Sequence, residues 1–106
     1  MKRKEPDGLR MIGGKNPGKF DLGRIVATPG ALDALQRAEE SAPRYLALHA
    51  RGDWGDVCQE DAKLNNDAVT SGKRILSAYT LKSGVKIWIL TEGSRECTTI
   101  LLPEDY

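Results

Sequence analysis

The last third of the chain holds three short segments with strong strand character, separated by two turn signals. The segments RILSAYTL (74–81), VKIWILTE (85–92) and ECTTILLP (96–103) are rich in β-branched, aromatic and aliphatic residues. Ser83-Gly84 and Gly93-Ser94 stand between them, and glycine is common in tight hairpin turns because it tolerates positive φ. The pattern predicts a three-stranded antiparallel β-meander.

Four elements are expected before the meander. A β-prone run ends at Thr28, whose side chain can cap a helix that has Pro29 in its first turn. Gly52 and Gly72 can end two later helices in a left-handed conformation. The expected elements are one strand at 22–28 and three helices at 29–39, 42–51 and 57–70. We predict an α+β fold with the helices packed on one face of the sheet.

Alternation along the predicted strands sorts their side chains into two faces. If both hairpins are tight, Tyr79 lies opposite Trp88, and Trp88 lies opposite Thr99. The predicted core face contains Leu76, Ala78, Thr80, Val85, Ile87, Ile89, Thr98, Ile100 and Leu102. The second face contains Ile75, Ser77, Tyr79, Leu81, Lys86, Trp88, Leu90, Cys97, Thr99 and Leu101. A one-residue slip in either hairpin would mix these sets.

Two aromatic sites are candidates for partner binding. Tyr79 and Trp88 share the second face with Lys86 and Thr99, and large aromatic side chains outside a core are typical of interface anchors. Coverage of that face by the first strand or by the N-terminal residues is the alternative. Trp54 lies between glycines in RGDWGD, which suits either a loop anchor for a partner or a plug that seals the helix layer. We favour the plug.

Residues 1–19 are expected to form a flexible basic tail, and residues 20–106 a single domain. The tail contains five glycines and prolines after Asp7. Its basic side chains are Lys2, Arg3, Lys4, Arg10, Lys15 and Lys19. Such a tail can contact nucleic acid through charge alone, although a solvated leader is the simpler interpretation. No apolar run approaches the ~20 residues that span a bilayer, so we predict a cytoplasmic protein.

Neither a metal site nor a cofactor is expected. Four carboxylates crowd the start of the third helix, where they can cap free amides and complement the helix dipole: Asp53, Asp56, Glu60 and Asp61. The spacing of Gly13, Gly18 and Lys19 matches a phosphate-binding loop, but Phe20 stands where serine or threonine would bind magnesium. Cys58 and Cys97 have no activating partner nearby in sequence, and we expect them to be buried thiols.

No catalytic set is assembled either. His49 is the only histidine, and we expect it on a helix surface. The alternative is a small ribonuclease, because the order of one strand, helices and three antiparallel strands resembles that of the mRNA-cleaving and ParE-like toxins. Such an enzyme would use His49 as its acid or base, together with Arg51, Arg74 or Arg95.

Several segments resemble, in their order, a family of small proteins from bacterial plasmids, integrative elements and phages: VATPGALDAL, HARGDWGDVCQED, ILSAY, WILTE and TTILLPEDY. Members are often described as plasmid-related or as type I restriction enzyme modification subunits. The chain lacks the glycine-rich loop and the Asn/Asp-Pro-Pro-Tyr motif of a methyltransferase. The resemblance therefore implies an association with restriction or other defence systems rather than an activity.

We predict a non-enzymatic protein-binding module of a mobile genetic element that counteracts or regulates a host defence system. Its partner would be a host defence component or a second copy of the chain. The small ribonuclease and a nucleic-acid-binding accessory protein that uses the tail are the alternatives.

Overall fold

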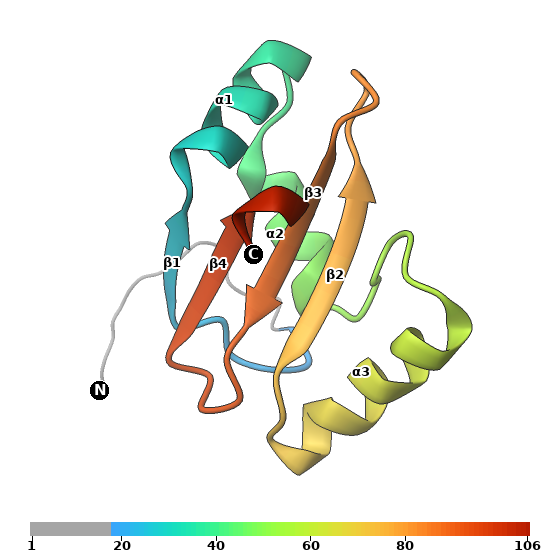
Figure 1. The fold of residues 1–106 in the computed structure, drawn as a ribbon. Helices are drawn as coiled ribbons and strands as arrows, with labels where there is room; N and C mark the ends of the chain where they lie inside the picture. Colours follow the sequence, from blue (N-terminus) through green and yellow to red (C-terminus); the bar gives the residue numbers. More distant parts are fainter. Residues whose placement is uncertain (1–17) are drawn as a thin grey trace.

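The computed structural model describes residues 18–106. None of the helices in that part of the chain has the length and apolar character needed to cross a membrane. The elements are β1 (Arg24–Ala27), α1 (Pro29–Ala38), α2 (Ala42–Ala50), α3 (Gln59–Ser71), β2 (Ile75–Thr80), β3 (Lys86–Thr91), β4 (Cys97–Leu101) and the short 3₁₀ helix η1 (Pro103–Asp105) (Figure 1). The predicted α+β class is confirmed.

The sheet has four strands in the order β1-β4-β3-β2, and it is mixed. β2, β3 and β4 are antiparallel neighbours, whereas β1 pairs with β4 in parallel. This corrects the expected arrangement, in which the sheet was an antiparallel meander of three strands. The three helices carry the chain from β1 to the far edge, so the first and second strands in sequence lie at opposite edges.

The helix ends follow the expected capping chemistry at two of the sites that we compared. The Thr28 side chain accepts a hydrogen bond of 3.1 Å from the Ala31 amide and caps α1. Gly72 ends α3 with a φ of 78°. The start of α3 differs from expectation, because Cys58 is its N-cap and no side chain caps it there. Asp56 instead accepts a hydrogen bond of 2.6 Å from the Thr80 hydroxyl.

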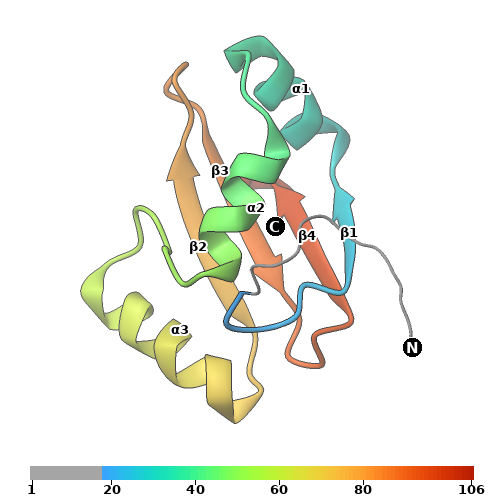
Figure 2. The same ribbon diagram turned by 180° about the vertical axis from the view of Figure 1, so that it is seen from behind.

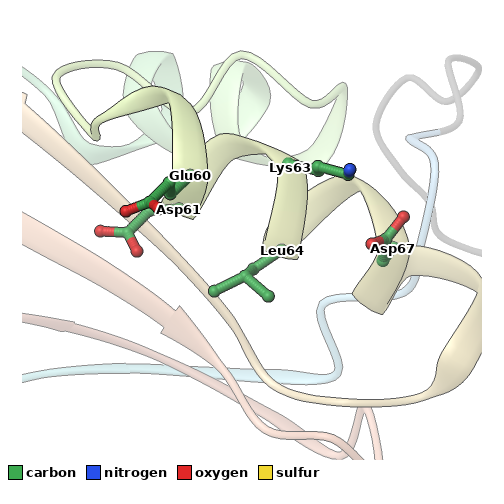
Figure 3. A pocket seen from close by; sticks show the side chains of 5 residues that line it. All are labelled: Glu60, Asp61, Lys63, Leu64 and Asp67. Atoms are coloured by element: carbon green, nitrogen blue, oxygen red, sulfur yellow. The ribbon is translucent and has the colours of Figure 1, made fainter.

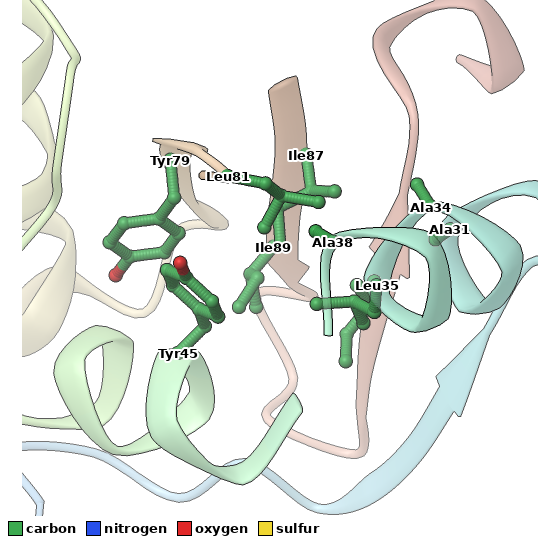
Figure 4. Close-up of a cluster of buried hydrophobic side chains, with 10 residues drawn as sticks. Ala31, Ala34, Leu35, Ala38, Tyr45, Tyr79, Leu81, Ile87 and Ile89 are labelled. Atoms are coloured by element: carbon green, nitrogen blue, oxygen red, sulfur yellow. The ribbon is translucent and has the colours of Figure 1, made fainter. Parts of the chain in front are cut away.

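The main core lies between the sheet and the layer of α1 and α2 (Figure 2). Three isoleucines form its centre on the sheet side, with exposed fractions of 0 to 1%: Ile87, Ile89 and Ile100. Burial of a side chain of this size stabilises the folded state by roughly 1.5 to 3 kcal/mol. From α1, Ala31, Ala34, Leu35 and Ala38 pack against this layer (Figure 4).

The second core cluster joins α3 to the β2 edge of the sheet. Trp54, Ala68 and Ile75 are its buried members, and α3 runs beside β2 in both ribbon views (Figures 1 and 2). The side-chain amide of Asn65 on α3 pairs with the backbone of Leu76, donating to the carbonyl at 2.8 Å and accepting from the amide at 3.2 Å. This contact places α3 against the outer edge of β2.

Candidate functional site

Tyr79 and Trp88 lie on opposite faces of the sheet, which corrects the predicted aromatic face. In the observed register, Ala78 lies opposite Trp88 and Tyr79 lies opposite Ile87. The reason is the length of the first hairpin loop. Leu81 and Val85 are its last bonded pair, at 2.8 Å, so the loop has three residues instead of two, and Gly84 adopts a φ of 92°.

The second hairpin is longer than expected without changing the faces. Trp88 lies opposite Leu101 rather than Thr99, and the last backbone bond joins the Glu92 amide to the Cys97 carbonyl at 3.0 Å. Because the shift is two residues, side chains of β3 and β4 stay on their predicted faces. Only β2 is inverted: Ile75, Ser77 and Tyr79 face the helices, and Leu76, Ala78 and Thr80 face away from them.

Tyr79 is therefore a core residue and not a partner-binding one. Its side chain is 5% exposed, and its ring lies 5.1 Å from that of Tyr45 (Figure 4). The hydroxyl donates a hydrogen bond of 2.6 Å to the Asp53 carbonyl. Burial raises the pKa of Tyr79 to about 12, so the phenol stays neutral. It ties β2 to the loop between α2 and α3.

Trp88, Lys86 and Thr99 lie together on the face that points away from α1 and α2. We call this face the open face, and the register defines its members: Arg24, Val26, Leu76, Ala78, Thr80, Lys86, Trp88, Leu90, Cys97, Thr99 and Leu101. One row of side chains, Leu76, Leu90, Thr99 and Val26, crosses all four strands. Trp88 and Thr99 are half-buried, and Lys86 is exposed.

The C-terminal residues fold back over part of the open face (Figure 1). The Tyr106 ring lies 5.7 Å from the Trp88 ring in an edge-on arrangement, and the Arg74 guanidinium lies 5.6 Å from the Tyr106 ring centre. The Asp105 carboxylate accepts hydrogen bonds from the Thr28 hydroxyl at 2.7 Å and from the Leu102 amide at 3.0 Å. These bonds hold the pKa of Asp105 below its usual range, and the bond from Thr28 ties the C-terminal residues to the start of α1.

His49 is fully buried, although a surface position was expected. Its ring joins a chain of polar side chains across the helix-facing side of the sheet. Nδ1 lies 2.6 Å from the Ser77 hydroxyl and Nε2 lies 2.8 Å from the Thr91 hydroxyl. Thr91 in turn lies 2.8 Å from Thr98, whose hydroxyl donates to the Leu22 carbonyl at 2.6 Å. The chain therefore connects β2, β3, β4 and the segment before β1.

The carbonyl at the end of this chain fixes the tautomer of His49. Thr98 uses its only proton on Leu22, so Thr91 donates to Thr98 and Nε2–H of His49 donates to Thr91. Nδ1 is then the acceptor, and Ser77 donates to it. Burial, with a smaller effect of the Arg95 charge, lowers the pKa of His49 to about 4. The imidazole is neutral at pH 7 and fully bonded.

Two of the arginines proposed for a ribonuclease, Arg74 and Arg95, already contact other groups. Arg74 lies over Tyr106 on the open face. Arg95 lies 5.5 Å from the Phe20 ring centre, and its guanidinium donates to the Ala68 and Lys73 carbonyls at 2.6 and 2.7 Å. Because His49 has no exposed surface, a substrate would reach it only if the core opened.

Trp54 is a buried plug, as we expected. Its side chain is 6% exposed, and the indole nitrogen donates a hydrogen bond of 3.0 Å to the Asn66 side chain. The Phe20 ring stacks on it at 6.1 Å, and the His49 ring meets it edge-on at 5.9 Å. Trp54 therefore closes one end of the core and is not presented to a partner.

Most of the basic tail lies outside the described residues. This applies to the proposed nucleic-acid contacts Lys2, Arg3, Lys4, Arg10 and Lys15. Lys19 belongs to the described part, where its amide donates a hydrogen bond of 2.7 Å to the Ala50 carbonyl at the end of α2. The domain therefore includes Lys19, which we had assigned to the tail.

The two cysteines are not the buried thiols that we expected. Cys58 is exposed at the start of α3, and Cys97 is half-buried on the open face. Both are free. Their surroundings explain the difference, because the first turn of α3 projects into solvent and the open face has no helix over the Cys97 end of β4 (Figure 1).

An open hollow on α3 is lined by acidic side chains around a leucine. Glu60, Asp61, Lys63, Leu64 and Asp67 line it, all from the same helix (Figure 3). Leu64 is 64% exposed. Within residues 18–106, no three His, Cys, Asp or Glu side chains come together in a way that would hold a metal ion. The carboxylates Glu60 and Asp61 lie in the first turn of α3, where they complement the helix dipole.

A polar pocket between α2, β2 and the first hairpin contains several hydrogen bonds among its own lining residues. Glu40 accepts from the Tyr45 hydroxyl at 2.5 Å, from the Arg44 guanidinium at 3.0 Å and from the Lys82 amide at 2.6 Å. The bonds from Tyr45 and Lys82 lower the pKa of Glu40, while burial beside Glu40 raises that of Tyr45. This cluster ties the segment between α1 and α2 to the first hairpin.

A scan against protein-family models gave no match, and searches of curated proteins and of solved structures gave no significant match.

Proposed function

We propose that this protein is a non-enzymatic binding module that uses the open face to hold a protein partner. The observation that carries the proposal is the uneven coverage of the sheet. α1 and α2 pack on one face, whereas among residues 18–106 the residues after β4 are what fold over the other face (Figures 1 and 2). Apolar side chains on a face without a helix layer are typical of interfaces.

The uncovered part of the open face combines apolar area with polar groups at its margins. Val26 is 37% exposed, and Leu76, Cys97 and Thr99 are half-buried. Arg24 and Lys86 are exposed at two margins of the same face. An apolar centre with a charged rim is the usual composition of a protein-binding surface, so a partner with a complementary apolar patch would fit here.

The resemblance to small proteins of plasmids and phages suggests the class of partner to test first. A host defence protein, such as a component of a restriction system, is the partner that we propose. Binding would then counteract or regulate that system by occupying one of its surfaces. The function requires no catalytic residue, in keeping with the burial of His49.

The test uses a substitution at the centre of the open face and a matched one elsewhere. Thr99→Arg places a long charged side chain in the row that crosses all four strands, and Leu64→Arg places the same side chain on exposed α3. Both variants should keep the circular dichroism spectrum of the original protein. Each is used to capture proteins from a bacterial host carrying a defence system, and captured candidates are then purified and titrated by calorimetry.

We expect the original protein and Leu64→Arg to bind the same purified partner, and Thr99→Arg to lose at least tenfold in affinity. Plasmid transformation of a restricting host gives the functional readout, since only a protein that binds should raise its efficiency. Equal binding by Thr99→Arg would refute the open face as the site. Loss of binding with Leu64→Arg alone would move the interface to the acidic hollow on α3.

A further inference from the structure

β1 leaves one edge of the sheet unpaired within residues 18–106. It is the outermost strand in the order β1-β4-β3-β2, as Figure 1 shows. The amides of Arg24 and Thr28 donate to the β4 side, to the Glu96 and Ile100 carbonyls, each at 2.9 Å. Because backbone groups alternate in direction along a strand, the N–H and C=O groups of Ile25 and Ala27 point outward.

The side chains at this free edge are apolar and exposed. Ile25 is 47% exposed and Val26 is 37% exposed. Natural edge strands are usually guarded by lysine, proline, a bulge or a covering segment. β1 has the sequence RIVA, so only Arg24, at its first position, can act as a guard. The strand is therefore competent to pair with another strand.

The flanking residues leave one register that uses every outward group. Gly23 has a φ of 67°, which ends the extended backbone on one side, and Pro29 begins α1 on the other side and has no amide proton. In an antiparallel pair with a second copy, Ile25 of each copy must therefore lie opposite Ala27 of the other copy. This gives four hydrogen bonds and places Val26 against Val26 on the two-fold axis.

The same register brings opposite charges together at both ends of the pair. Arg24 of one copy lies opposite Thr28 of the other, and both side chains are on the open face. Thr28 holds the Asp105 carboxylate at 2.7 Å. Directly opposed residues have their Cβ atoms about 5 Å apart, within reach of a guanidinium. The edge is positive at one end and negative at the other, so it is complementary to an inverted copy of itself.

We propose that β1 pairs antiparallel with β1 of a second copy, so that the two four-stranded sheets join into one continuous sheet. The pairing is isologous and closes on itself, which limits assembly to a dimer. Since Val26 meets Val26 on one side of the sheet, both open faces lie on that side. This last consequence rests on the proposed function: the dimer would present two partner-binding faces on one surface, which raises avidity.

A strand of four residues makes a small contact, below the size of a standard stable interface. We therefore expect a dimer that dissociates on dilution rather than a permanent one. Sedimentation velocity of the full-length chain over a range of concentrations measures this equilibrium directly. The sedimentation coefficient should rise from the monomer value to the dimer value as concentration increases.

The decisive test uses two variants with opposite charges at the two-fold axis. Val26→Lys and Val26→Glu each place like charges directly opposite each other in the dimer, which is destabilising, so each variant alone should remain a monomer. An equimolar mixture places lysine against glutamate and should restore the dimer. Because Val26 is partly exposed, both variants should fold, and Leu32→Lys and Leu32→Glu on exposed α1 serve as controls that dimerise like the original chain.

Several results would overturn the proposal. One of them is a full-length chain that stays monomeric up to about 1 mM, because the dissociation constant of such a dimer would be too weak to matter. Dimerisation of Val26→Lys alone, or no recovery in the mixture, is another. A dimer that forms only after residues 1–17 are removed would show that the tail occupies the edge instead. Thr99→Arg should still dimerise, so failure of partner binding and failure of dimerisation are separable.

Discussion

The two edges of the sheet differ in whether their outward backbone groups are hydrogen-bonded. At the β2 edge, Asn65 pairs with both backbone groups of Leu76, and the loop before α3 pairs with Ala78. There, the Ala78 amide donates to the Trp54 carbonyl at 3.1 Å, and the Asp56 amide donates to the Ala78 carbonyl at 2.6 Å. At the β1 edge, the outward groups of Ile25 and Ala27 have no partner among the described residues.

Burial accounts for this difference. The β2 edge adjoins the cluster of Trp54, Ala68 and Ile75, so a backbone group left unpaired there would be shielded from water at a cost of about 1 to 3 kcal/mol. The β1 edge lies at the surface, where water satisfies free amides and carbonyls. The buried β2 edge is therefore hydrogen-bonded within the chain, whereas the exposed β1 edge is left to water. The β1 edge is also the one available to a second strand.

The polar chain through His49 connects the two edges, and its removal should have the largest effect on stability. His49→Ala deletes a buried ring and both of its hydrogen bonds to Ser77 and Thr91. We expect the free energy of unfolding to fall by about 3 to 5 kcal/mol, as for other buried rings. Urea titration followed by circular dichroism measures the loss.

His49→Leu is the matched control for this prediction. Leucine refills much of the volume but cannot bond to Ser77 or Thr91, so its remaining cost reports the polar chain apart from the cavity. If His49→Leu were as stable as the original protein, the chain would contribute nothing and the two edges would be joined by packing alone.

The same histidine predicts a pH dependence of stability with a defined window. Its pKa is about 4 in the folded protein and ordinarily about 6.5 in an unfolded chain. Below pH 6.5 the unfolded state binds the proton first, so stability is complete above that pH and falls as pH drops towards 4. The loss should reach roughly 3 kcal/mol. His49→Leu should lack this slope, and a parallel slope in both proteins would assign it to other groups.

Opening the closed edge should cost less than deleting the buried ring. Asn65 is 6% exposed, and Asn65→Ala leaves the amide and carbonyl of Leu76 without their partner. We expect a loss of about 2 to 3 kcal/mol in the free energy of unfolding. Asn66→Ala is the control, because it removes a single bond to the Trp54 indole and should cost less. If both variants lost the same free energy of unfolding, the two bonds from Asn65 to Leu76 would contribute no more than the single bond from Asn66 to Trp54.

The elements of this fold could be predicted from sequence better than their registers. Thr28-Pro29 and Gly72 marked helix ends through local chemistry. The predicted register of the first hairpin was wrong because Ser83-Gly84 suits a loop of two or three residues. One extra residue in the loop turns every side chain of β2 to the opposite face of the sheet. Tyr79 was misplaced for that reason alone, whereas Trp88 was placed on the correct face.

Other features depend on contacts between distant segments. His49 bonds to Ser77 and Thr91, which lie 28 and 42 residues away in the sequence, and no local pattern indicates such a set. The parallel pairing of β1 with β4 joins residues over 70 positions apart, such as Arg24 and Cys97. The sole histidine lies within the apolar run 46–50 of α2, and that position in the sequence does not show whether the ring is buried.

The smallest predicted effect is the sharpest test of the two edges. Ile25 and Ile75 stand at opposite ends of one row across the sheet, next to Thr98 and Thr91, and they are 47% and 0% exposed. Ile25→Thr should cost less than about 1 kcal/mol in dilute solution, because its surroundings are already hydrated. Ile75→Thr buries an extra hydroxyl and should cost severalfold more. Thermal unfolding of both variants at low concentration would contradict the comparison if the two losses were equal, since β1 would then be as firmly enclosed as β2.

At high concentration, where the proposed dimer forms, the cost of Ile25→Thr should grow while that of Ile75→Thr stays constant, because only the β1 edge gains a partner with concentration.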